Sequence, residues 1–94
     1  MELREIRTFI QVAQRKSFSR AAEALGYSQA AVTIQIKQLE NELGIHLFDR
    51  IGKQTILTHQ GERFYRHAVS IMKEVSRAAS SVAEPKELSG VLSI

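Results

Sequence analysis

Residues 18–37, FSRAAEALGYSQAAVTIQIK, contain two helical patterns separated by a glycine. Ser19 is predicted to cap a short first helix, and Gly26 is predicted to end it in a left-handed conformation. Ser28 is predicted to cap a second helix. Four apolar residues of the second helix recur at spacings of four, three and four, namely Val32, Ile36, Leu39 and Leu43. The stretch from about residue 18 to residue 37 therefore predicts a helix-turn-helix.

The face of the second helix opposite Val32 is predicted to be exposed, and it carries Ala30, Ile34 and Lys37, with Thr33 at one flank. In a helix-turn-helix the second helix enters the major groove of DNA with its N-terminal residues first. We expect Gln29 and Thr33 to hydrogen-bond base edges. We expect Ala30 and Ile34 to contact thymine, whose methyl group is the apolar feature of that groove. Alternatively, Ile34 is a solitary exposed apolar residue, which proteins tolerate.

Basic residues fall into two segments on either side of an acidic one. Residues 15–37 hold four basic residues and one acidic residue, and residues 50–66 hold the same numbers. The segment between them has three acidic residues and no basic one. This pattern favours a polyanionic partner, although an uneven solvated surface would look the same. The candidates for phosphate contacts are Arg20, Lys37, Arg50 and Lys53. Arg50 has an alternative, which is a local ion pair with Asp49 or Glu42.

The regions outside the helix-turn-helix show two further patterns. Before it, apolar residues at helical spacing predict a helix over about residues 2–14. After Gly44, short apolar pieces around Gly52, Lys53 and Gln54 predict a two-stranded hairpin over about residues 47–57. Thr58 is then predicted to cap a long helix, which Pro85 prevents from continuing. The chain is therefore predicted to be mainly α-helical, with three helices, a two-stranded hairpin and a long fourth helix.

The long helix has an apolar repeat that averages 3.5 residues, which is typical of a coiled-coil seam. We therefore expect a homodimer whose interface contains Phe64, Ala68, Ile71, Val75, Ala78 and Val82. A dimer would place two recognition helices on one side of a duplex, so the expected target is an interrupted palindrome. The alternative is that this apolar face packs against the helix-turn-helix domain of the same chain.

The run SFSRAAEALGYSQAAVTIQIKQLENELGIHLFDR, followed by LTHQGERFYRHA, resembles the N-terminal DNA-binding region of LysR-type transcriptional regulators. The resemblance covers Met1 to about Ala83. It implies a winged helix-turn-helix whose wing is the hairpin around Lys53, and a linker helix that dimerises. It also implies that the wing and the residues matching Ser28, Gln29, Ala30, Thr33 and Ile34 approach DNA.

This chain departs from the family pattern at two of these positions. The family usually has proline where this chain has Ala30, and often a polar or basic residue where it has Ile34. Both differences make the expected reading surface more apolar.

The resemblance also divides the chain into parts. Residues 1–58 are expected to form the winged helix-turn-helix domain, and residues 59–83 the linker and dimerisation helix. Residues 84–94 are expected to be a hinge and the start of an absent C-terminal domain that binds a small-molecule inducer. No cofactor is expected within the chain itself, and a tetramer is expected to depend on the absent domain.

Several classes of protein are disfavoured. The chain has no cysteine, which excludes a disulfide framework and a thiol nucleophile, and its longest apolar run is three residues, too short to cross a bilayer. We therefore expect a soluble cytoplasmic protein. Neither a catalytic site nor a metal site is expected, because the three histidines form no ligand or general-base pattern and no nucleophile motif is present. The remaining rival is a winged-helix module that binds protein instead of DNA.

Overall fold

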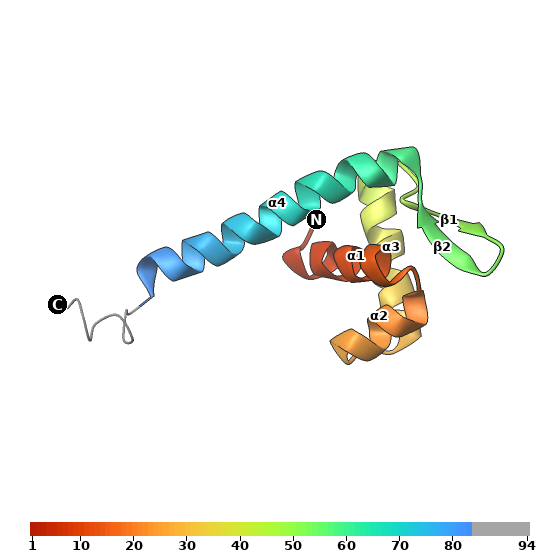
Figure 1. The fold of residues 1–94 in the computed structure, drawn as a ribbon, viewed down its shortest axis with the longest axis horizontal. Coiled ribbons are helices and arrows are strands. Elements are labelled where there is room, and N and C mark those ends of the chain that lie inside the picture. The colour runs from red at the N-terminus through yellow and green to blue at the C-terminus, as the bar shows by residue number, and fades with distance from the viewer. Residues whose placement is uncertain (84–94) are drawn as a thin grey trace.

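The computed structural model describes residues 1–83, and the predicted hinge and following strand at 84–94 lie outside the described residues. The elements, in chain order, are helices α1 (Leu3–Arg15), α2 (Phe18–Leu25) and α3 (Gln29–Leu43), strands β1 (Phe48–Ile51) and β2 (Gln54–Leu57), and helix α4 (His59–Val82). Figure 1 shows α1, α2 and α3 gathered into one bundle, the hairpin at its side, and α4 running across the bundle and beyond it. This is the predicted winged helix-turn-helix followed by a long helix.

Helix α1 begins and ends with local hydrogen bonds. At its start, the buried Glu5 accepts a hydrogen bond from the Glu2 N–H through its carboxylate, at 3.2 Å. At its end, Lys16 adopts a left-handed conformation with φ of 54°, and its N–H donates to the Val12 carbonyl at 2.8 Å. This residue turns the chain sharply, so that α2 starts two residues later.

The cap of α2 differs from the prediction. Ser17, and not Ser19, is the N-cap, and its hydroxyl oxygen accepts the Arg20 N–H at 3.1 Å. Capping at Ser17 makes Phe18 the first helical residue, and its ring then packs against Phe48 with centroids 5.8 Å apart. The prediction of a cap at Ser19 was therefore wrong by two residues, because the cap is set by a contact with the distant hairpin.

The turn between α2 and α3 is as predicted. Gly26 ends α2 with φ of 77°, a conformation that side chains rarely adopt. Ser28 caps α3 by accepting the Ala31 N–H at 3.1 Å. The small side chains of Ala21 and Ala22 are buried, which lets the two helices lie close together. Val32, Ile36 and Leu39 are buried as predicted, whereas Leu43 is half-buried.

The hairpin is antiparallel, with Phe48 opposite Leu57 and Arg50 opposite Thr55. Thr58 follows β2 directly and joins the hairpin to α4. Its hydroxyl accepts the Gly61 N–H at 2.9 Å and donates to the His46 carbonyl at 2.6 Å. The Thr58 N–H donates to the Leu47 carbonyl at 3.0 Å. These bonds fix the direction in which α4 leaves the hairpin.

An aromatic cluster at the centre of the core joins three elements. The Phe9 ring of α1 is fully buried and lies 5.4 Å from Phe48, 5.2 Å from Phe64 and 6.2 Å from Tyr65, measured between ring centroids. The Phe9–Phe64 pair is edge-to-face, a geometry that adds to the energy gained from burial alone. Phe9 therefore holds the hairpin and the first turns of α4 against the bundle. Within residues 1–83, no helix combines the length and the apolar character needed to cross a membrane.

Candidate nucleic-acid interface

The N-terminal half of α3 presents the predicted reading residues together on one exposed face. Gln29, Ala30 and Lys37 are exposed, Ile34 is 57% exposed, and Thr33 is half-buried at the edge. The opposite face is packed against the bundle through the buried residues Val32, Ile36 and Leu39. The helix is therefore fixed on one side and accessible on the other, as a helix that enters a groove must be.

A partly buried hydrogen bond that was not predicted joins α1 to α3 and resists rotation of α3. The Thr8 hydroxyl, 1% exposed, donates to the side-chain carbonyl of Gln35 at 2.6 Å. Rotation of α3 about its own axis would break this bond and leave a buried hydroxyl unpaired, which is costly. The sequence signal that could have found it is a threonine among the buried positions of the first helix, between Ile6 and Phe9.

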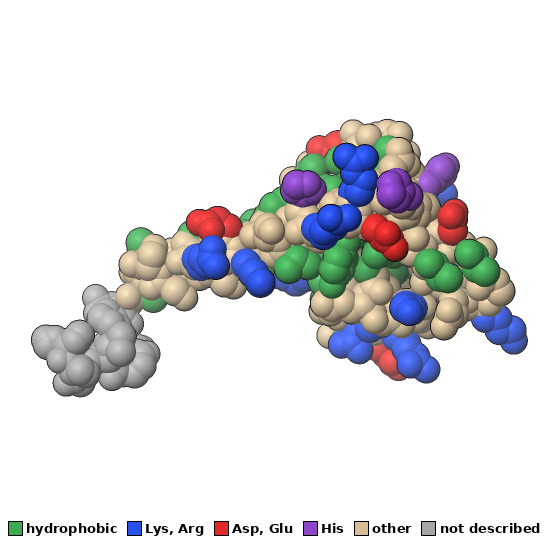
Figure 2. Space-filling view, turned by 45° about the horizontal axis from the view of Figure 1, so that its top comes forward, with side chains coloured by type: hydrophobic (Ala, Val, Ile, Leu, Met, Phe, Trp, Pro, Cys, Tyr) green, Lys and Arg blue, Asp and Glu red, His purple; other side chains and the backbone are tan. Residues whose placement is uncertain are grey.

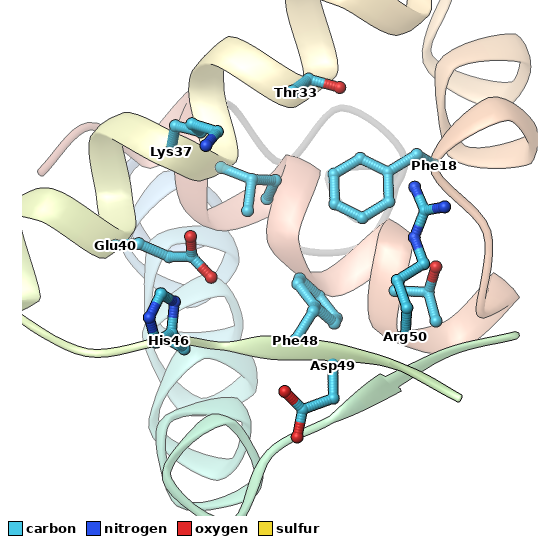
Figure 3. Close-up of a pocket in the computed structure, with 10 residues that line it drawn as sticks. Phe18, Thr33, Lys37, Glu40, His46, Phe48, Asp49 and Arg50 are labelled. Carbon is cyan, nitrogen blue, oxygen red and sulfur yellow. The ribbon is translucent and has the colours of Figure 1, made fainter. Parts of the chain in front are cut away.

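The hairpin, which is the wing of the fold, places Arg50 beside the start of α2. Alternation along β1 puts Phe48 and Arg50 on the inner face of the wing and Asp49 on the outer face. The Arg50 guanidinium carbon lies 5.9 Å from the centroid of the Phe18 ring, within the range of a cation–π contact. Figure 3 shows the Arg50 side chain directed toward Phe18, while Asp49 points away from it.

The alternative partners of Arg50 are not used. Among the described residues no ion pair includes Arg50, and Glu42 instead pairs with the Met1 ammonium group. This hydrogen bond raises the pKa of the Met1 ammonium. The guanidinium charge of Arg50 is therefore not neutralised by a carboxylate within the described part of the chain.

A cavity of about 310 Å³ separates α3 from the wing. Thr33, Lys37 and Glu40 border it from α3, and His46, Phe48 and Arg50 border it from the opposite side (Figure 3). The Glu40 carboxylate already has a hydrogen-bond partner within the chain, because it accepts the Leu47 N–H at 2.7 Å. Cationic and anionic groups are mixed around this cavity. Across residues 1–83, no group of three His, Cys, Asp or Glu side chains could hold a metal ion.

The four predicted phosphate contacts lie on three elements. Arg20 is exposed on α2, Lys37 on α3, and Arg50 and Lys53 on the wing. Figure 2 shows Lys and Arg side chains at the lower end of the globular part, where α2 lies, and at its right-hand end, where the wing lies. The basic residues therefore lie around the exposed face of α3 and not on one element alone.

The predicted dimer seam needs a correction. Ala68 has no exposed surface, because α4 packs against α1 at this point, and Phe64 packs on Phe9. Ile71 also lies against the core of its own chain. The prediction was wrong for Ala68, and the alternative of intrachain packing describes the first half of α4. Val75 is half-buried, and Ala78 and Val82 are exposed.

Comparison with known proteins agrees with this architecture. A family model for the bacterial regulatory helix-turn-helix protein, lysR family, matches residues 3–62, from α1 to the first turn of α4. The HTH-type transcriptional regulator BudR of Klebsiella aerogenes is 46% identical over 96 residues, which cover 100% of this chain and 66% of BudR. The uncharacterized HTH-type transcriptional regulator YwqM of Bacillus subtilis is 40% identical over 94 residues, which cover 100% of this chain and 32% of YwqM.

Solved structures show the same fold. The crystal structure of the BenM DNA-binding domain in complex with benA site 1 DNA superposes with a TM-score of 0.83 at 37% identity, and the match covers 86% of this chain and 91% of that one. The fold and the exposed face of α3 define a winged helix-turn-helix protein. The chain belongs to the LysR family of bacterial regulatory helix-turn-helix proteins. It spans about a third of the length of YwqM.

Proposed function

We propose that this chain is the DNA-binding part of a LysR-type transcription factor, which binds an interrupted palindromic duplex as a dimer through the major groove. The observation that carries the proposal is the accessible N-terminal half of α3, with Ile34 57% exposed beside exposed basic residues of α2 and the wing. The BenM DNA-binding domain, which has the same fold at 37% identity, has been solved in complex with DNA. That complex supports a nucleic-acid role for a chain with this fold.

The groups on the exposed face suit a division of roles. Gln29 and Thr33 carry hydrogen-bonding groups that read base edges, while Ala30 and Ile34 contact thymine methyl groups. Ser28 lies beside them as the cap of α3, and its hydroxyl is already engaged with the Ala31 N–H. Arg20, Lys37, Arg50 and Lys53 contact phosphates, which supply affinity that does not depend on sequence.

A second copy of the chain would supply the other recognition helix. A shallow groove between α1 and α4 is lined by the side chains of Ile10, Val69 and Met72, among others. It lies next to the exposed half of α4, which carries Val75, Ala78 and Val82. We propose that the α4 of the second copy covers this surface. The interface is thereby moved toward the C-terminal half of α4 relative to the predicted seam.

The test of the proposed function is selection of bound duplexes from a random pool at moderate salt, followed by sequencing. We expect enrichment of an inverted repeat, because two symmetry-related recognition helices read two half-sites. We also expect affinity to fall by about 0.9 log units per contacted phosphate for each tenfold rise in salt. A chain that retains no duplex, or that binds with no dependence on salt, would contradict the proposal and favour the protein-binding alternative.

Replacing Ile34 by arginine is expected to change base preference. The variant Ile34→Arg should lose selection for thymine under each half-site by about tenfold, because a cation replaces the apolar contact with the methyl group. The same selection carried out on the variant measures this. The matched control is Leu3→Arg on α1, away from the proposed DNA contacts, since Leu3 is an exposed leucine with 45% of its surface accessible. If both variants keep the preference of the unsubstituted chain, Ile34 does not read the base.

A further inference from the structure

A second and smaller cavity, of about 180 Å³, lies where α2, α3 and the wing meet. Its lining includes Lys16 from the turn between α1 and α2, Ser19 from the first turn of α2, Gln29 from the first turn of α3, and Arg50 and Lys53 from the wing. Three of these side chains are cations, and no carboxylate lines the cavity. This charge distinguishes it from the larger cavity beside α3, where Glu40 and Asp49 are also present.

The three cations have no anionic partner among the described residues. The ion pairs within residues 1–83 involve the Met1 ammonium, Arg4 and Arg77, and none of them includes Lys16, Arg50 or Lys53. Arg50 is held in place by the Phe18 ring, at 5.9 Å. Like charges that share one small cavity repel one another, so binding an anion there is electrostatically favourable.

The polar lining favours a phosphate group in particular. Lysine and arginine donate charge-assisted hydrogen bonds to phosphate oxygens, and the hydroxyl of Ser19 and the side-chain amide of Gln29 add neutral donors. Gln29 also begins the helix that is proposed to read bases, so an anion in this cavity lies beside the reading surface. The ligand must therefore be an anion and must lie next to the bases. A backbone phosphate of the bound duplex is anionic and is covalently linked to the bases, so it meets both requirements.

We propose that this cavity binds one backbone phosphate of the duplex through Lys16, Arg50 and Lys53. The inference rests on the proposed function, and it adds Lys16 to the interface. It also assigns two wing residues and one residue of the turn between α1 and α2 to the same phosphate. Within residues 1–83 no hydrogen bond joins the wing to α2 or to the start of α3, so a phosphate bound in this way would link the wing to the helix-turn-helix. Arg20 and Lys37 do not line this cavity, and their contacts are with other phosphates.

The experiment is ethylation interference on the duplex recovered by selection, using the unsubstituted 94-residue chain and three variants. Lys16→Asn removes the charge, and asparagine tolerates the left-handed conformation that residue 16 adopts, with φ of 54°. Lys53→Gln removes the wing charge. Arg7→Gln is the control, because it removes one positive charge at an exposed position of α1 outside the cavity. Thermal unfolding of each variant confirms that it is folded.

Ethylation of one phosphate in each half-site should block binding by the unsubstituted chain and by Arg7→Gln. Lys16→Asn and Lys53→Gln should both lose sensitivity at that same phosphate. Each should also lower the slope of log affinity against log salt by about 0.9. The proposal is overturned if the two variants lose sensitivity at different phosphates, or if Lys16→Asn keeps the original pattern and slope. If the unsubstituted chain binds no duplex, the proposed function fails first and this proposal fails with it.

Discussion

Replacing Gly61 by alanine should destabilise the chain, although the same change usually stabilises a helix. Gly61 is buried in the first turn of α4. A Cβ atom there would overlap the Leu47 carbonyl oxygen and lie 3.1 Å from Leu57 Cδ2. Alanine is favoured over glycine in a helix by about 1 kcal/mol. Overlap with a backbone atom outweighs this gain, and we expect a net loss of about 2 kcal/mol in the free energy of unfolding.

Urea denaturation of Gly61→Ala and of the unsubstituted chain measures this loss. The control is Gln60→Ala, one residue earlier, where the side chain is exposed and the change should stay within about 0.5 kcal/mol. Because the Leu47 carbonyl also accepts the Thr58 N–H at 3.0 Å, the variant should displace the wing relative to α4 and weaken DNA binding. A Gly61→Ala variant as stable as the unsubstituted chain would contradict the close contact between α4 and the wing.

Val75→Asp should convert the proposed dimer into monomers. Val75 lies at the point where α4 leaves its own domain, and in a symmetric interface each copy would bury one unpaired carboxylate. We expect the dimer dissociation constant to rise at least about a hundredfold, since two uncompensated charges are desolvated for each dimer. Sedimentation equilibrium measures this constant.

Two further measurements separate loss of the dimer from loss of the fold. Ser70→Asp, at an exposed position of the same helix, adds the same charge and should leave the dimer intact. Binding of Val75→Asp to a single half-site should stay close to that of the unsubstituted chain, while its binding to the full inverted repeat should fall. If Val75→Asp sediments as a dimer at the same protein concentration as the unsubstituted chain, the interface lies elsewhere on the chain.

The local part of the fold could be predicted from the sequence because its signals are local. The spacing of Val32, Ile36 and Leu39 defines the buried face of α3. Ser28 has the hydroxyl that an N-cap requires, and Gly26 lacks the side chain that would disfavour a left-handed C-cap. The exposed reading surface follows from the same spacing, because side chains that point away from the core are accessible to solvent. The hairpin tip at Gly52 and Lys53 follows from turn chemistry.

The remaining features depend on contacts between distant residues. Ser17 and Ser19 are both acceptable caps, and only the packing of Phe18 on Phe48 selects Ser17. The apolar repeat of α4 suits a coiled-coil seam and intrachain packing equally well. Only the position of α1 shows that Ala68 is buried within its own chain. The contact of Arg50 with Phe18 could not be predicted either, because it joins the wing to α2.

The aromatic cluster around Phe9 also has a consequence for the spacing of DNA half-sites. Phe64 and Tyr65 attach the start of α4 to α1, so α4 leaves the domain as a rigid arm and not as a hinge. In a dimer built on α4, two such arms set a fixed distance between the recognition helices. Half-sites at another distance can be reached only if the duplex bends or twists, and the energy of that deformation depends on the spacer sequence. Spacer length and stiffness thus become part of what the dimer selects, through bases that it does not contact.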